Sequence, residues 1–217
     1  MKTNIAIVLS IIATGTGGFG AYTAWQANKF RQPLDKHQQV AMSFKDQISS
    51  AEHRGDNSNA NIVRIEYEKY EKSWRDSQFL ERVTASIRSL DMENITETKR
   101  TEISNALNKI TNSYAVTTAS PEAFGAAYYA LGEYKKAAEQ LGVALATNPS
   151  DNNIRALQAA SLVSASNLSN HDSASLKIQA LELVSEKDFR FTEKQKHFLL
   201  NTNDESIRMA LKKSANK

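Results

Sequence analysis

The chain has 217 residues, a formal net charge of +3, no cysteine, three prolines and eight glycines. Acidic and basic residues are interspersed, which indicates a solvated surface and argues against a nucleic-acid partner. Strand-like alternation of apolar and polar residues is absent. We therefore predict an all-α fold.

Residues 4–25 (NIAIVLSIIATGTGGFGAYTAW) carry no charge. As a helix they would be about 33 Å long, enough to cross a bilayer core of roughly 30 Å. We predict an uncleaved, single-pass membrane anchor over residues 1–28. A removed signal peptide is the alternative, although Gly18 and Gly20 form a poor cleavage site. The small residues spaced by four along this segment would let a partner helix pack closely in the membrane, and they are Ala13, Gly17 and Ala21.

The charges that flank this segment support two opposite orientations of the chain in the membrane. Lys29, Arg31 and Lys36 follow it, and the positive-inside tendency alone would keep the rest of the chain in the cytoplasm. Lys2 followed at once by an apolar run is instead the layout of an exported chain. We expect a bacterial inner-membrane protein with a periplasmic C-terminal domain, and the cytoplasmic side is the alternative.

Residues 34–118 are predicted to form a helical region. Apolar residues share one stripe over 34–51, and the polar run 55–61 is the clearest break in the chain. A long helix over 60–91 and a second over 96–117 are predicted to form an antiparallel hairpin. That hairpin either buries its own stripe, as a cap or bundle does, or serves as an arm that binds another subunit.

The next segment, 119–151, carries the strongest pattern in the chain (ASPEAFGAAYYALGEYKKAAEQLGVALATNPSD). Ser120 before Pro121 predicts a helix start. Gly132 suits a left-handed turn at the end of the first helix, and Pro149 stops a second one. The segment is therefore predicted to be a pair of antiparallel helices.

This helical pair resembles one tetratricopeptide (TPR) repeat. The positions that match the family pattern are Gly125, Tyr128, Gly132, Tyr134, Ala137, Leu141, Ala144 and Pro149. Pro121 and Phe124 depart from it. The resemblance implies a right-handed α-solenoid of stacked helical hairpins that binds other proteins.

The resemblance weakens after residue 151. Residues 152–166 are predicted to be the first helix of a second repeat, with 173–186 as its degenerate partner. Thr192 and Gln195 fit a capping box, and helices over 193–200 and 204–213 would close the stack. Residues 119–217 are thus predicted to form a TPR-like region.

No pattern in the sequence indicates catalysis, so we predict neither an enzyme nor catalytic residues. The four histidines show no ligand-like spacing, and no metal or cofactor is expected. The glycines at positions 15, 17, 18 and 20 lie within the apolar segment, which excludes a phosphate-binding loop.

The resemblance places a concave groove along the first helix of each repeat. Its lining positions would be Glu122, Ala126, Tyr129 and Ala130, followed by Asn153, Ala156, Ala160, Val163 and Ser164. These residues are mostly small and apolar, with Tyr129 as the expected anchor. The expected occupant is a helix or an apolar segment of a partner protein.

Two functions remain from these observations. The first is a membrane-anchored TPR-like scaffold in a cell-envelope or secretion-type assembly, in which changing Tyr129 breaks binding but not folding. The second is a structural single-span subunit whose TPR-like part is only packing. In that case binding survives a change at Tyr129 and fails on changing Gly17 or the long hairpin.

Overall fold

The computed structural model describes residues 19–93, 95–111, 119–169, 171–185 and 190–215, with the helical backbone alone at 19–35 and 213–215. Ten helices and no strand lie in these residues, which confirms the all-α prediction. The helices are α2 (Phe19–His53), α3 (Asn57–Val83), α4 (Ala85–Arg88), α5 (Glu97–Thr111), α6 (Pro121–Ala130), α7 (Tyr134–Thr147), α8 (Asn152–Leu168), α9 (Ser173–Ser185), α10 (Glu193–Leu200) and α11 (Glu205–Ala215). The chain divides into two compact units, residues 1–68 and 69–217, with the boundary inside α3.

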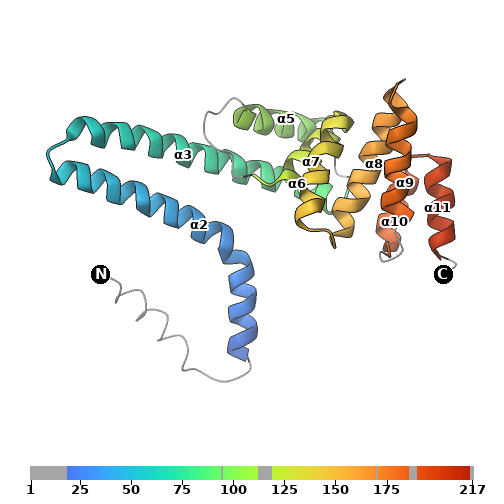
Figure 1. The fold of residues 1–217 in the computed structure, drawn as a ribbon, viewed down its shortest axis with the longest axis horizontal. Helices are drawn as coiled ribbons and strands as arrows, with labels where there is room; N and C mark the ends of the chain where they lie inside the picture. The colour runs from blue at the N-terminus through green and yellow to red at the C-terminus, as the bar shows by residue number, and fades with distance from the viewer. Residues whose placement is uncertain (1–18, 94, 112–118, 170, 186–189, 216–217) are drawn as a thin grey trace. The chain divides into compact units, whose positions relative to one another are not determined.

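The first unit is a hairpin of α2 and the start of α3 (Figure 1). Gly55 turns the chain with φ of 71°, and the Asp56 carboxylate accepts a hydrogen bond from the Asn59 amide at 3.1 Å. The predicted polar loop is therefore shorter than expected, because α3 begins at Asn57. The Phe44 and Tyr67 rings meet at 5.6 Å between centroids.

The predicted helix over 60–91 breaks at Thr84, between α3 and α4. The Thr84 hydroxyl is buried and donates to the carbonyl of Leu80 at 2.8 Å. After α4 the chain turns at Leu90, whose φ of 57° lies in the left-handed region that a leucine seldom adopts. The break at Thr84 and the turn at Leu90 thus end α3 and α4 within a few residues of each other.

Helix α5 packs against the part of α3 that belongs to the second unit. Ile103, Leu107 and Ile110 join the same buried cluster as Leu80 and Val83. The Lys109 ammonium lies 5.9 Å from the centre of the Phe79 ring. The predicted antiparallel hairpin is therefore limited to α5 and the part of α3 after residue 68. Residues 57–68 of α3 pack on α2 instead.

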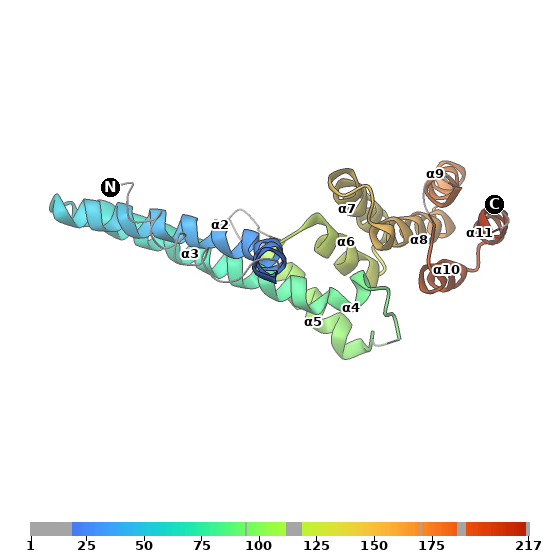
Figure 2. The same ribbon diagram turned by 90° about the horizontal axis from the view of Figure 1, so that it is seen from below.

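The helices α6 to α11 pack in pairs and follow one another in a row (Figure 2). Ser120 caps α6, with its hydroxyl accepting from the Ala123 amide at 3.1 Å, and Gly132 turns the chain with φ of 79°. The capping box of Thr192 and Gln195 starts α10. These local predictions are confirmed because each depends on a few neighbouring residues.

Helices α6 and α7 approach closely at one glycine. A Cβ atom added at Gly125 would lie 2.5 Å from Leu141 Cγ and 3.2 Å from the Leu141 backbone nitrogen. Leu141 is fully buried, so it has little room to move aside. The small residue at this position thus sets the distance between the two helices.

We predict that Gly125→Ala lowers the free energy of unfolding. Overpacking of this kind costs about 1–3 kcal/mol, and the better helix propensity of alanine returns only about 1 kcal/mol. The matched control is Gly142→Ala, where the new Cβ would meet only the flexible end of Gln158, at 3.1 Å. Urea denaturation should rank Gly125→Ala below wild type and Gly142→Ala at or above it. The reverse order would show that the α6–α7 contact is not tight.

Candidate functional site

The nine predicted groove positions lie on α6 and α8, two helices that contact each other. We call this surface the inner face. Five of its residues are between 0 and 2% exposed, namely Ala126, Ala130, Ala156, Ala160 and Val163. The other four are half-buried, namely Glu122, Tyr129, Asn153 and Ser164. The fold thus packs the five small apolar residues into the core, while the other four keep part of their surface exposed.

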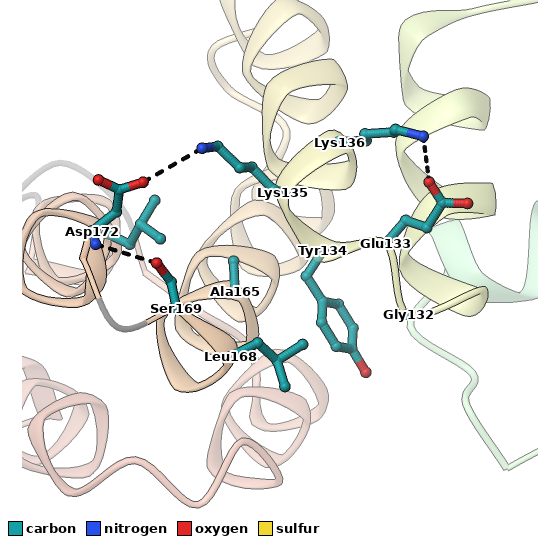
Figure 3. Close-up of a pocket in the computed structure, with 10 residues that line it drawn as sticks. Gly132, Glu133, Tyr134, Lys135, Lys136, Ala165, Leu168, Ser169 and Asp172 are labelled. Atoms are coloured by element: carbon teal, nitrogen blue, oxygen red, sulfur yellow. Dashed lines mark hydrogen bonds and ion pairs between the residues drawn. The ribbon is translucent and has the colours of Figure 1, made fainter.

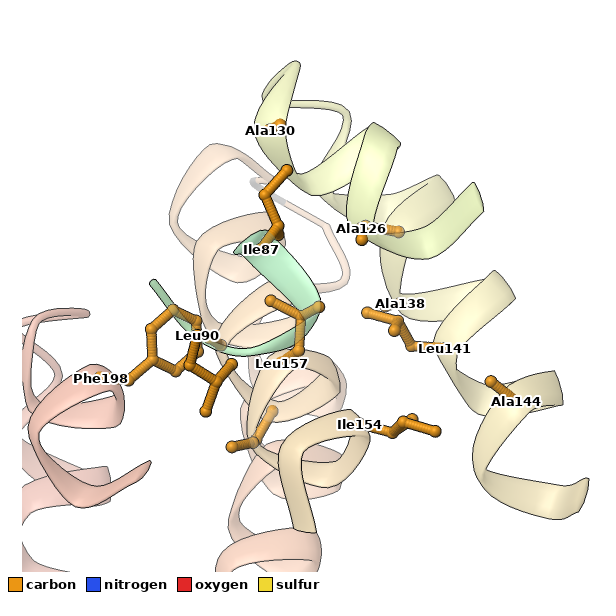
Figure 4. Packing of buried hydrophobic residues seen from close by; sticks show 14 of the residues in the cluster. Ile87, Leu90, Ala126, Ala130, Ala138, Leu141, Ala144, Ile154, Leu157 and Phe198 are labelled. Atoms are coloured by element: carbon orange, nitrogen blue, oxygen red, sulfur yellow. The ribbon is translucent and has the colours of Figure 1, made fainter. Parts of the chain in front are cut away.

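Helix α4 covers the inner face. Its Ile87 is fully buried and lies between Ala126 and Ala130 of α6 and Leu157 of α8 (Figure 4). Helix α4 contacts both α6 and α8. The alanines at these positions leave room for the Ile87 side chain. A segment of the chain itself therefore takes the place that was expected for a partner.

An arginine of α4 forms the polar part of this contact. Arg88 pairs with Glu81 at 3.0 Å and with Glu122 at 3.8 Å, and it also donates to the carbonyl of Glu81 at 2.8 Å. The Glu81 carboxylate accepts from the Ser120 amide at 2.7 Å. These bonds join α3, α4 and the start of α6.

The titration of the Glu122 carboxylate is shifted by these surroundings. Burial raises the pKa of Glu122, and the nearby Asp151 and Glu81 act in the same direction while Arg88 opposes them. Sequence analysis did not single out Glu81 or Arg88, whose only signal is a charge spacing that solvated helices also show.

Helix α10 closes the other part of the inner face. The Phe198 ring lies 5.9 Å from the Tyr129 ring, which also meets Tyr134 at 5.4 Å. The Gln195 amide donates to the Asn153 side-chain oxygen at 2.8 Å. The predicted anchor Tyr129 is therefore a packing residue in this structure. The scaffold hypothesis assumed that a substitution at Tyr129 would leave folding intact. In this structure such a substitution removes contacts within the fold itself.

An open cavity of about 360 Å³ lies beside the inner face, between the α6–α7 turn, the end of α8 and the start of α9 (Figure 3). We call it the α7–α9 cavity. Its apolar lining comes from Tyr134, Ala165, Leu168 and Leu176. Leu168, the last residue of α8, is 75% exposed. No motif in the sequence predicts this cavity, because its lining comes from three separate helices and the turns beside them.

The predicted membrane helix lies mostly before the first described residue, Phe19. Ala13 and Gly17 lie outside the described residues, and the Ala21 side chain does too. Among the described helices, none combines the length and the apolar composition that crossing a bilayer requires. In the same residues, no cluster of three or more histidine, aspartate or glutamate side chains is arranged to hold a metal ion.

We predict that Tyr129 makes stability fall at high pH. Burial, and then the neighbouring Tyr134, raises the pKa of the Tyr129 phenol to about 12. Because this folded-state pKa exceeds the unfolded value of about 10, the stabilisation is complete below about pH 10 and is lost as pH rises through about 12. Its full size is up to about 2–3 kcal/mol.

The measurement is urea denaturation at about pH 9, below the range in which the stabilisation is lost, and at about pH 11.5, within that range. Wild type should lose more stability than Tyr129→Phe between the two conditions, because phenylalanine keeps the ring contacts and removes the ionisable group. Equal losses in the two proteins would mean that burial does not raise the pKa of the Tyr129 phenol.

Comparison of the chain with protein-family models, with curated proteins and with solved structures gives no match. The functional argument for this protein therefore depends on its own residues and their arrangement.

Proposed function

We propose that this chain is a membrane-anchored, protein-interaction subunit, and that its α2–α3 hairpin makes the main contact with a partner protein. In this proposal the apolar segment 4–25 is the anchor. The TPR-like helices α6 to α11 form a module that fills its own inner face. The location we propose is the inner membrane of a bacterium, with the helical units in the periplasm.

The observation that carries the proposal is the apolar surface of the hairpin. Among residues 36–68, the buried side chains are Ala41, Ala51 and Ala60, which bury little area. Large aliphatic side chains in the same stretch are exposed, namely Val40 (38%), Met42 (65%), Ile62 (60%) and Ile65 (53%). We call these four residues the hairpin surface.

A hairpin of this kind gains stability from a partner. Helices in proteins depend mainly on packing of their apolar faces, and alanine contacts alone supply little of it. Covering an exposed isoleucine or methionine fully contributes about 1.5–3 kcal/mol, before the cost of association. Two of these residues, Val40 and Met42, lie on α2, and the other two, Ile62 and Ile65, lie on α3. A contiguous exposed apolar patch is a usual mark of a protein contact.

The packing of the inner face favours this structural-subunit hypothesis over the open-groove scaffold. A partner could enter the inner face only if α4 left it. That would expose Ile87 and Leu90, which are 0% and 5% exposed in the folded unit. Exposing two such side chains costs about 3–6 kcal/mol. A groove ligand would have to supply at least that much in addition to its own binding free energy.

The test is a double substitution, Ile62→Asp with Ile65→Asp, in the full-length chain. Because both positions are exposed on a helix, the change should cost only about 0.5 kcal/mol each in helix propensity. We expect the variant to stay folded by circular dichroism and to lose its higher-mass complex on native gels and after crosslinking in membranes. The matched control is Val143→Asp on α7, a valine that is 53% exposed.

The two variants separate the hypotheses. Loss of the complex in the hairpin variant, with the complex kept in Val143→Asp, supports the proposal. If the complex persists in the hairpin variant, the proposed function is wrong. It is also wrong if both variants lose the complex to the same extent.

A further inference from the structure

We propose that a groove along one side of the α2–α3 hairpin is the contact between two copies of this chain, packed antiparallel about a two-fold axis at Ser50. The inference rests on the proposed function in one respect, namely that the N-terminal anchor holds both copies in one membrane. It names a partner for part of the hairpin surface, since Met42 lines the groove, whereas Ile62 and Ile65 do not.

The groove lies within the first unit, between α2 and the start of α3. It is open to solvent and has a volume of about 650 Å³. Asp46, Ser50 and Arg54 line its α2 side, and all three are exposed. Asn59 and Val63 line the α3 side. We call the three residues on the α2 side the α2 seam.

The α2 seam carries one acid and one base at equal distances from its centre. Asp46 lies four residues before Ser50 and Arg54 lies four residues after it, so all three share one side of the helix. The two charges are about 12 Å apart along the helix, which is too far for an ion pair within one chain. Within the described residues neither side chain forms an ion pair, whereas the neighbouring Glu52 pairs with Arg64.

This arrangement is complementary to itself when the second copy runs in the opposite direction. A two-fold axis at Ser50 brings each Asp46 opposite Arg54 of the second copy, so two ion pairs form across the contact. A parallel pair of helices would instead place like charges opposite each other, which disfavours that arrangement. The charges therefore determine both the partner and its direction.

The same axis accounts for an exposed apolar residue. Met42 is 65% exposed and lies eight residues before Ser50. In the antiparallel pair it reaches the turn that follows α2 in the second copy, where part of its apolar surface is removed from water. The small Ser50 side chain leaves room for the two helices to approach at the axis.

The membrane supplies the concentration that a small contact requires. Residues 39–53 of α2 are about 23 Å long as a helix, so the contact buries less than the roughly 800 Å² per partner of a typical stable complex. Two copies anchored in one bilayer meet at a raised effective concentration. A contact of this size is then sufficient for association.

The experiment is disulfide crosslinking of the purified full-length chain in vesicles of phosphatidylethanolamine and phosphatidylglycerol. The chain has no cysteine, so Ser50→Cys introduces a single thiol. The matched control is Ser49→Cys, an exposed position that is turned by about 100° round α2 and does not line the groove. We expect oxidation to form the dimer about fivefold faster in Ser50→Cys, because a disulfide requires the two Cα atoms to lie close together.

Charge reversal in the Ser50→Cys chain tests the pairing itself. Asp46→Arg and Arg54→Asp should each slow dimer formation about tenfold, because each change replaces two attractive pairs by two repulsive ones. When the two variants are reconstituted together in equal amounts, the rate should recover to about half that of Ser50→Cys, since only mixed pairs then carry opposite charges. Recovery on mixing also shows that both variants are folded.

Three results would overturn the proposal. They are equal dimer formation in Ser49→Cys and Ser50→Cys, charge reversal without effect, and no recovery on mixing. A groove that binds a different protein gives the first result, because the vesicles contain this chain alone.

Failure of the seam can be told apart from failure of the proposed function. On native gels, the complex in the test of Ile62→Asp with Ile65→Asp is the species above the mass of this dimer. If that complex persists while Ser50→Cys forms its dimer as described, the α2 seam stands and the contact at Ile62 and Ile65 is wrong. If the complex is lost while Ser50→Cys reacts no faster than Ser49→Cys, the proposed function stands and the seam is wrong.

Discussion

The burial of Ile87 between α6 and α8 is the contact on which the second unit depends. Helix α4 has only four residues and cannot be stable by itself, because its few backbone hydrogen bonds do not offset the entropy lost in forming a turn. Packing therefore holds it in place, together with the ion pairs of Arg88. In return, α4 removes the alanine-rich sides of α6 and α8 from water. Helix α4 and the pair α6 and α8 therefore stabilise each other by mutual burial.

This arrangement explains why small residues recur on the inner face. Ala126, Ala130 and Ala156 have no atoms beyond Cβ, so a neighbouring segment can come close to the helix axes. In an open groove the same alanines would admit a partner helix. In this chain they admit α4. The composition of the surface is compatible with either occupant, and only the path of the chain before α6 decides between them.

The sequence predicted the elements that local rules control. The cap at Ser120, the turn at Gly132 and the capping box at Thr192 depend on residues a few positions apart, so each could be found without knowledge of the fold. The start of α3 was placed late, because a polar run can begin a helix when an aspartate caps it. The break at Thr84 was missed, since the apolar spacing of three and four residues continues across it.

The candidate site could be predicted only in part. The resemblance identified residues on two helices, α6 and α8, that do contact each other, because the spacing from one helical pair to the next is regular along the chain. It could not show that α4 covers them, since a repeat pattern says nothing of segments outside it. The α7–α9 cavity could not be predicted for a similar reason, because Tyr134 lies 34 residues before Leu168 in the sequence. Contacts between distant segments are the part of a fold that periodicity does not encode.

The position of α4 has a consequence for how the second unit folds. Stacked helical repeats usually contact only their neighbours, so they can form one after another along the chain. Here Ile87 lies beside Leu157, about 70 residues later in the sequence. The chain between them must therefore form a closed loop before either side chain is buried. During synthesis, α4 leaves the ribosome before α8 has been made. The apolar side chains of α4 therefore stay exposed to solvent until α8 is available to cover them. The unit should accordingly fold as one cooperative body rather than repeat by repeat.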